Sequence, residues 1–503
     1  MKRCRPHGTA TPRPMAWRPE RNRSIGRTPG NRRILPRPND WLLSEDQGLA
    51  SHVIIAADKS KAFGRKKGNR MSLDASLREQ LDTYVEGRRD RLMEIIRDLV
   101  RIPSENSPPV GHEEACQKYV AEYLKGQGLE TELYYLSEVK GLKEHPLFFP
   151  GRDYSNRPNV GARRRGRAGG RSLVLSGHID TVPRGTQPWT RDPFGGEVEG
   201  NRLYGRGSND MKAGVAVNVF MAEALRDLGI ELKGDLIIET VSDEEFGGVN
   251  GTIAGRIKGY NGDAAIITEP TFLKICPAQR GGRTVHIRLS STGGILQEGK
   301  FPTGVIDAIR YFLVKVQEFA EQRKRTAPVH EIYAGLVDPV PVSITKLTTG
   351  PWGTGEPITI PETCQIEMYW QLMPGEKQED VEREFHEWFE RIVKAAPELF
   401  PVKPELEFPI RWLPGSAISL NEPLVTELAE CVQHALQEKP VIQGFDAPCD
   451  MYVFHQAAKT PAVLWGPRGG NTHAADEYVE IDSVVAAAKA QLEFVCQWCG
   501  VAR

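Results

Sequence analysis

The chain has 503 residues, of which 40% are hydrophobic and 26% are charged, and its formal net charge is -1 at pH 7. This length allows a large core and more than one domain. The near-zero charge gives no field that would favour nucleic-acid or membrane binding, and no apolar run approaches the length of a membrane span. We therefore expect a cytoplasmic protein.

Residues 1–70 are rich in Arg, Pro and Gly and contain only short apolar pieces such as Val53-Ile54-Ile55. Such a segment cannot bury enough apolar surface to fold, so we predict a disordered basic extension. A well-patterned helix follows Met71, and we expect the native protein to start there. The alternative is a tail that binds nucleic acid, which would require these residues to be translated.

The elements predicted next alternate between strands and helices. In chain order they are helices at 77–99 and 114–127, a strand at 130–135, a polar loop at 150–170, a strand at 173–175, a helix at 215–225 and strands at 235–241 and 264–268. This alternation argues for a mixed sheet covered by helices on both faces.

The pattern changes between residues 280 and 400. Strands are predicted at 284–289, 340–345 and 365–370, and helices at 303–321 and 379–395. Strand, helix, two strands and helix is the order of a small ferredoxin-like α+β sandwich. The expected fold class is therefore α/β, with residues 71–279 and 401–503 forming one domain and residues 280–400 inserted into it.

His178 and Asp180 follow the apolar strand that starts at Leu173. In an open α/β sheet, ligands bind at the carboxyl ends of the strands. An imidazole can bind a divalent metal when its other nitrogen carries the proton, and a carboxylate two residues on can accept that proton. This pattern favours His178 as a metal ligand and Asp180 as the residue that orients it.

Four later places carry Asp, Glu or His in similar contexts. Asp210 lies in a Gly-rich turn before a helix, Glu244 and Glu245 follow a buried strand, Glu269 lies at the tip of the next strand, and His473 lies in a loop after Gly466. Adjacent carboxylates at a strand end repel one another, so a nearby cation explains them better than a solvated turn.

Five ordered motifs then resemble the M20 family of dinuclear zinc hydrolases. The motifs are Leu175-Ser-Gly-His-Ile-Asp-Thr-Val-Pro183, Tyr204-Gly-Arg-Gly-Ser-Asn-Asp-Met-Lys-Ala-Gly214, Ser242-Asp-Glu-Glu-Phe-Gly-Gly248, Thr268-Glu-Pro270 and His473 with Asp476-Glu477. The family includes acetylornithine deacetylase, succinyl-diaminopimelate desuccinylase, aminoacylase and carboxypeptidase G. The resemblance runs from about Met71 to the C-terminus.

The resemblance implies a bimetallic site. Asp210 would bridge two zinc ions, or cobalt ions in their place, with His178 and Glu269 on one and Glu245 and His473 on the other. Glu244 would be the general base that takes a proton from the attacking water. The inserted segment would be a lid through which two copies form a homodimer.

The lid departs from the family pattern. The family has a His before Pro-x-x-Gly that binds the oxyanion, whereas counting back from Gly304 places Gln297 there, and counting from Pro302 places Glu298 there. Gln297 is the tentative substrate-binding residue, and His286 is an alternative donor. A family Arg in a later lid strand is also absent, with Gln371 in that region.

The predicted function is hydrolysis of the amide bond of an N-acyl amino acid or dipeptide-like small molecule. A metallocarboxypeptidase is one alternative, and a catalytically impaired member that serves as a binding or regulatory protein is another. The presence of His178, Asp210, Glu244, Glu245, Glu269 and His473 together argues against decay.

Overall fold

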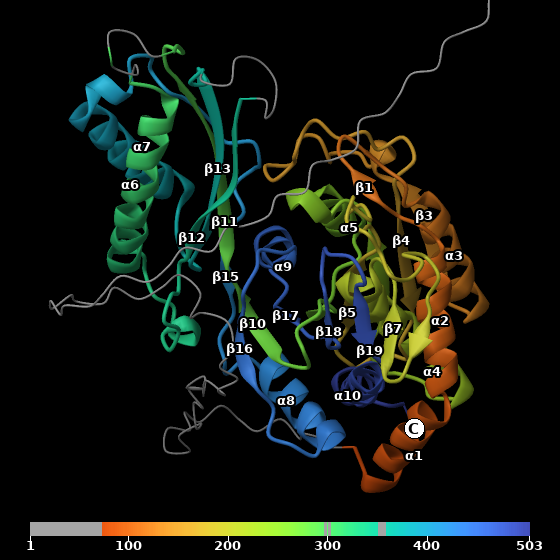
Figure 1. The fold of residues 1–503 in the computed structure, drawn as a ribbon. Helices are drawn as coiled ribbons and strands as arrows, with labels where there is room; N and C mark the ends of the chain where they lie inside the picture. Colours follow the sequence, from red (N-terminus) through yellow and green to blue (C-terminus); the bar gives the residue numbers. More distant parts are fainter. Residues whose placement is uncertain (1–72, 296–298, 300–302, 351–358, 503) are drawn as a thin grey trace, which may run out of the picture. The chain divides into compact units, whose positions relative to one another are not determined.

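The computed structural model describes residues 73–295, 299, 303–350 and 359–502. The predicted extension at 1–70, and Gln297 with Glu298, lie outside the described residues. A nine-stranded mixed sheet forms the centre of the described part (Figure 1). Its strands are β3 (Glu130–Tyr135), β4 (Pro158–Arg164), β5 (Leu173–His178), β8 (Leu236–Val241), β9 (Ala264–Ile267), β10 (Ile275–Gln279), β15 (Ser416–Ala417), β16 (Ile442–Phe445) and β17 (Ala462–Leu464).

The order in this main sheet is β15-β10-β17-β9-β5-β8-β4-β3, with β16 beside β10. The four strands β17, β9, β5 and β8 run parallel to one another, and β10 and β4 flank them antiparallel. The predicted mixed sheet is therefore present, and its parallel centre places several strand ends at one edge.

Both faces of the main sheet are buried under helices. In β5, Leu173 and Leu175 join one hydrophobic core and Val174 joins another, because successive side chains of a strand point to opposite faces. The first core contains residues of α1 (Ala75–Gly87), α2 (Arg89–Arg101), α3 (Glu114–Gly126), α4 (Ala213–Asp227), α8 (Pro423–Leu436) and α10 (Ile481–Cys499). The second contains residues of α5 (Asn250–Lys258) and α9 (Met451–Val453).

Two predictions in this part are wrong. The polar loop expected at 150–170 contains the strand β4, in which Val160 and Ala162 are fully buried. Its arginines are compatible with a strand because Arg163 bonds Asp235 at 2.9 Å and Arg164 donates to a backbone carbonyl at 3.0 Å. The single helix expected at 77–99 is two helices, with α1 ending at Gly87.

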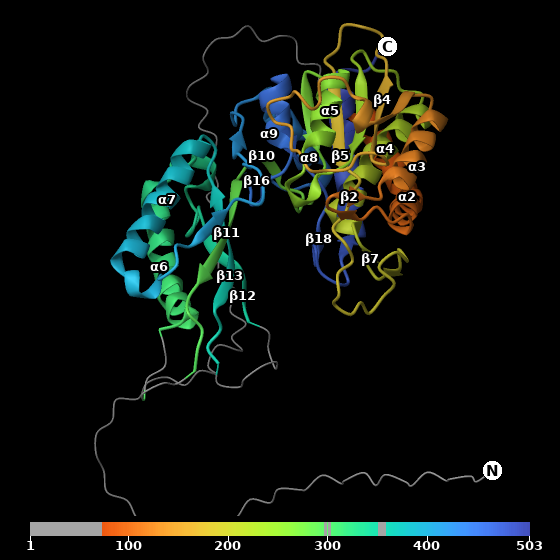
Figure 2. The same ribbon diagram turned by 90° about the horizontal axis from the view of Figure 1, so that it is seen from above.

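The inserted sheet has four antiparallel strands in the order β12-β13-β11-β14. These are β11 (Gly281–Ser290), β12 (Val342–Thr349), β13 (Thr363–Leu372) and β14 (Glu405–Glu407), and the helices α6 (Val305–Thr326) and α7 (Gln378–Ala395) accompany them. Figures 1 and 2 show α6 and α7 side by side along this sheet. A separate hydrophobic core fills the space between them, as expected for a ferredoxin-like layer.

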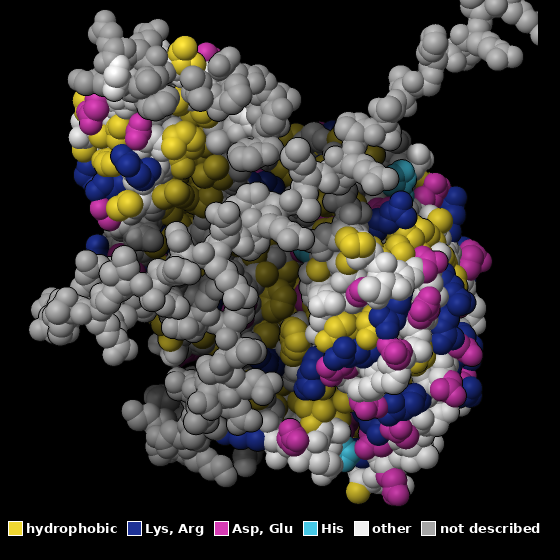
Figure 3. Space-filling model, viewed as in Figure 1, with side chains coloured by type: hydrophobic (Ala, Val, Ile, Leu, Met, Phe, Trp, Pro, Cys, Tyr) yellow, Lys and Arg dark blue, Asp and Glu magenta, His cyan; other side chains and the backbone are white. Residues whose placement is uncertain are grey.

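Two smaller sheets complete the described part. One pairs β1 (Asn106–Ser107) with β2 (Val110–Gly111), and the other has the order β18 (Gly469–Gly470), β19 (Tyr478–Glu480), β7 (Arg202–Tyr204) and β6 (Val198–Glu199). Among the described residues, no helix combines the length and apolarity needed to cross a bilayer. Figure 3 shows basic and acidic side chains interspersed over the face formed by α1, α2 and α3.

Candidate metal and active site

The carboxyl ends of three neighbouring parallel strands carry predicted site residues. His178 is the last residue of β5, Glu244 and Glu245 follow β8, and Glu269 follows β9. Parallel strands end at the same edge of a sheet, which is where such sheets bind ligands. The main sheet therefore brings these four side chains to one edge.

The small sheet of β18, β19, β7 and β6 brings in the other two residues. β7 pairs with β19, with Tyr204 opposite Tyr478. Asp210 follows β7, and His473 lies between β18 and β19. Pairing of the two strands therefore places a loop from the middle of the chain beside a loop from near its end.

The six predicted residues converge around the Asp210 carboxylate. Its Oδ1 lies 3.0 Å from Nε2 of His178, and its Oδ2 lies 3.3 Å from Nε2 of His473. Glu269 is 3.9 Å from the first histidine, and Glu245 is 3.2 Å from the second. The potential donor atoms form two groups that share Asp210, and within each group they lie within 4.8 Å of one another.

The orientation of His178 suits a metal ligand. Its Nδ1 lies 2.9 Å from the backbone oxygen of Asp180, which can only accept a hydrogen bond, so Nδ1 donates and the neutral imidazole carries its lone pair on Nε2. The predicted acceptor is the Asp180 carboxylate, whose Oδ1 is farther away at 3.7 Å. The backbone of Asp180 thus makes the closer contact with the imidazole.

The charges of the site also suit divalent cations. Burial raises the pKa of Glu269 to about 8, and the Asp210 and Glu245 carboxylates add to the rise although His178 opposes it. Hydrogen bonds to Asp210 and Glu245 raise the pKa of His473 to about 10. Buried carboxylates this close together retain protons unless cations neutralise them. Carboxylate oxygens and imidazole nitrogens are suitable ligands for such cations.

Comparison with known proteins assigns the chain to a family. The model of the family described as Peptidase family M20/M25/M40 matches residues 174–497. The chain belongs to this family. As a member, it is a metal-dependent hydrolase of carbon–nitrogen amide bonds, and the two donor groups are its candidate metal ligands.

Relatives of this M20 member extend over most of its length. N-formyl-4-amino-5-aminomethyl-2-methylpyrimidine deformylase of Bacillus subtilis is 24% identical over 451 residues, which is 83% of this chain and 97% of the relative. Acetylornithine deacetylase of Salmonella typhimurium is 29% identical over 316 residues, or 62% and 76% of the two chains.

Solved structures share the fold. Human carnosine dipeptidase 1 superposes with a TM-score of 0.67 at 15% identity, covering 84% of this chain and 99% of that one. The YXEP protein of Bacillus subtilis, described as a dinuclear metal binding peptidase from the M20 family, has a TM-score of 0.51 at 17% identity, with 82% and 98% covered.

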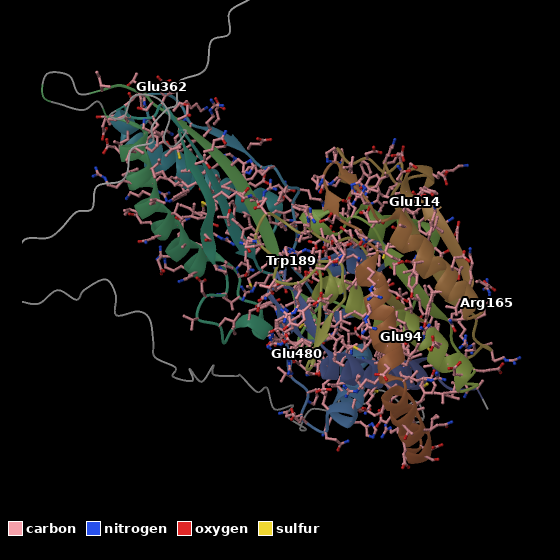
Figure 4. The ribbon with its side chains drawn as sticks, turned by 45° about the vertical axis from the view of Figure 1, so that its right-hand side comes forward. Glu94, Glu114, Arg165, Trp189, Glu362 and Glu480 are labelled. Carbon is pink, nitrogen blue, oxygen red and sulfur yellow. The ribbon has the colours of Figure 1, made fainter. Side chains whose placement is uncertain are left out.

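Glu477 supports the loop that carries Asp210. Its carboxylate is 1% exposed and accepts hydrogen bonds from the backbone nitrogens of Gly207, Asn209 and Asp210 at 3.0 to 3.1 Å. It also pairs with buried Arg206. The Arg206 guanidinium lies 5.2 Å from the centre of the ring of Trp189, which Figure 4 labels. Glu477 thus fixes the backbone from which the Asp210 side chain, shared by the two donor groups, projects.

Asp180 plays the same part for the loop after β8. Its carboxylate accepts hydrogen bonds from the backbone nitrogens of Glu244 and Glu245 at 3.1 Å, and from the Asn106 side chain at 2.9 Å. The sequence gives Glu477 only as part of a family motif and gives Asp180 a role toward the imidazole. In the structure both carboxylates hold backbone nitrogens of neighbouring loops in place. This role can be recognised only once the fold is known.

Of the lid candidates, His286 and Gln371 are described, and neither joins this constellation. Gln297 lies outside the described residues, so its predicted contact with substrate stays a prediction. His286 is on the inserted sheet, where its Nε2 pairs with Glu367 at 2.9 Å. The Gln371 side chain accepts a hydrogen bond from Arg280 and donates one to the backbone oxygen of Asp446. Its amide is therefore already hydrogen-bonded within the chain.

Proposed function

We propose that this protein is a dizinc amidohydrolase that removes the acyl group from a small N-acyl amine. The curated relatives named above are a deformylase and a deacetylase, which favours a deacylase. Imidazole nitrogens with carboxylate oxygens are the ligands of catalytic zinc sites, which favours zinc as the ion, with His178, Glu269, Glu245, His473 and the shared Asp210 as its ligands.

The position of Glu244 carries this proposal. Its carboxylate lines the same cavity as Asp210, Glu245, Glu269 and His473, yet it belongs to neither donor group. Its Oε2 lies 4.0 Å from Nε2 of His178. A general base must lie near the reacting centre without being a ligand, and Glu244 lies beside the donor groups and belongs to neither of them.

The chemistry is addition of water to the amide carbonyl followed by cleavage of the carbon–nitrogen bond. Two bound zinc ions would polarise the carbonyl and lower the pKa of the attacking water. Glu244 accepts the proton from that water and delivers it to the nitrogen that leaves. Burial raises the pKa of Glu244, and the nearby Glu269 and Asp450 carboxylates add to this rise although His178 opposes it, which suits a group that must hold the proton between the two steps.

A matched pair of neighbouring variants tests this assignment. Glu244→Gln should lower kcat by about 10²–10⁴ while two zinc ions per chain remain, because it removes only the proton carrier. Glu245→Gln should lose zinc as well as activity. Zinc per chain is measured by elemental analysis beside turnover of N-formyl and N-acetyl amines. A Glu244→Gln variant that keeps its activity, or that loses zinc as Glu245→Gln does, would contradict the assignment.

We further propose that two copies associate through the inserted segment. The edge strand β12 is largely exposed, and α6 contacts it and exposes Ile306, Leu313 and Val314 at 41% to 57%. An open strand edge beside exposed apolar side chains is a surface that a second copy can cover. Light scattering should give a dimer for the native chain and a monomer for L313E/V314E. A monomeric native chain would exclude this association.

A further inference from the structure

The substrate cavity beside the donor groups combines carboxylates with aromatic walls. It has a volume of about 180 Å³. The described residues that line it are Asp210, Glu244, Glu245, Phe246, Gly247, Gly248, Glu269, Leu413, Phe445, Ala447, Pro448, Cys449, Asp450, Tyr452 and His473. This set contains five carboxylates, three aromatic rings and no Lys or Arg.

Bound cations would not leave the cavity positive. Five carboxylates carry a formal charge of -5, and two divalent ions add +4, so a formal charge of -1 remains. The fifth carboxylate, that of Asp450, is 6% exposed and bonds Thr252 outside the cavity. A substrate carboxylate held here would lose its hydration and find no Lys or Arg among the described lining residues, which is unfavourable.

Arg280 and Arg283, at the junction of β10 and β11, have other partners. Arg280 bonds Gln371 and lies 3.3 Å from Asp446, and Arg283 pairs with Glu382. Arg411 lies 5.3 Å from the centre of the Tyr452 ring and does not line the cavity, although its Nη1 is buried without a hydrogen-bond partner. Arg411 is therefore the residue through which a carboxylate could still be recognised.

The apolar walls fit a flat ring. Phe246, Phe445 and Tyr452 contribute aromatic surface, and Leu413 and Pro448 contribute aliphatic surface. A cavity of roughly 150 Å³ accommodates a benzene ring. Aromatic side chains bind other aromatic rings through stacked or edge-to-face contacts. The volume and the walls thus both favour a six-membered aromatic ring attached to the amide.

We propose that the preferred substrates are N-acyl amines whose amine part is an aromatic or heteroaromatic methylamine without a carboxylate. This rests on the proposed deacylase function. Water adds to the acyl carbon, the carbon–nitrogen bond breaks, and the products are a small carboxylic acid and the free arylmethylamine. Discrimination against N-acyl amino acids comes from the lack of Lys and Arg among the described residues that line the cavity, and the aromatic walls position the ring.

Two substrates that differ by one group test this preference. N-formylbenzylamine and N-formylphenylglycine share the ring, the methine or methylene carbon and the formamide, and only the second has a carboxylate. The zinc-loaded native chain should have a kcat/KM at least about tenfold higher for N-formylbenzylamine, the effect of one unpaired charge. A preference for N-formylphenylglycine would overturn the inference and leave the deacylase function standing.

Variants identify the cause of the preference. Phe445→Arg places a cation in the wall and should shift the ratio of the two kcat/KM values toward N-formylphenylglycine by about tenfold, whereas Phe445→Met should not. Arg411→Gln should leave the ratio unchanged. If Arg411→Gln selectively removed turnover of N-formylphenylglycine, Arg411 would be a carboxylate receptor and the inference would be wrong. Silence of the zinc-loaded native chain on both substrates would overturn the inference, and silence on N-acetyl amines as well would overturn the deacylase function.

Discussion

His178 and His473 lie on opposite sides of the Asp210 carboxylate and are held in different ways. His178 ends a strand with parallel neighbours on both sides, its side chain is 2% exposed, and a backbone oxygen fixes its Nδ1. His473 lies in a loop with a φ of 61°, and its side chain is 49% exposed. The main sheet thus builds one half of the site, whereas the other half depends on a short, solvent-accessible loop.

The largest effects on activity are expected when each imidazole is removed. His178→Gly and His473→Gly should both lose more activity than the roughly 100-fold that loss of a supporting hydrogen bond costs, because each removes a proposed metal ligand. Added imidazole should restore activity to His473→Gly, whose site solvent can reach, and not to His178→Gly. Turnover is followed against imidazole concentration. Equal rescue of both variants would show that the two halves are equally accessible.

A change behind the shared ligand should affect both halves to a smaller extent. Glu477→Gln removes the charge that binds the backbone of Asp210, and it should weaken binding of both zinc ions by about 10–100-fold. Calorimetric titration of the metal-depleted protein with zinc measures this. Glu480→Gln, three residues away and labelled in Figure 4, is the matched control because its partner Arg468 is outside the site. Unchanged zinc affinity in Glu477→Gln would mean that this carboxylate does not support the ligand.

The smallest effect is expected for a charge on the inserted sheet. Burial acts to raise the pKa of Glu367, but hydrogen bonds from His286, Lys346 and Thr345 outweigh it and lower this pKa from 4.5 to about 2. The ionised form therefore stabilises the fold above pH 4.5, and this contribution is lost as the pH falls toward 2. Glu367→Gln should cost at most about 1 kcal/mol of unfolding free energy near neutral pH and less in acid. Denaturant titrations at several pH values measure this loss of unfolding free energy. The hydrolytic activity should not change, because Glu367 lies outside both donor groups.

The candidate ligand positions can be predicted from the sequence because each follows a recognisable strand or glycine-rich turn. His178 and Glu269 stand at the tips of apolar runs, and the resemblance to a family adds Asp210 and His473 in order. Their convergence in the structure follows from parallel strands that end at one edge.

Other features depend on contacts between distant segments, which local patterns do not contain. The sequence of β4 is predicted to be a polar loop because it contains Arg163 and Arg164. These arginines bind partners that lie just before β8 in the chain, which the local pattern does not reveal. Asp180 binds the backbone nitrogen of Glu244, 64 positions away, and Glu477 binds that of Asp210, 267 positions away. The cavity walls combine Phe246 with Phe445, which no single motif joins.

The order of the ligands along the chain also affects how the protein matures. His178 emerges from the ribosome early, and the inserted sheet has its own core, so it can fold while β10 still lacks its neighbours β15, β16 and β17. Domains generally fold as units during synthesis, from the N-terminal side onward. His473 is made last of the six predicted residues, and a nascent chain that already contains His178, Asp210 and Glu269 but not His473 has only one complete donor group. Synthesis therefore completes the second donor group only when His473 has been made, 204 residues after Glu269 completes the first.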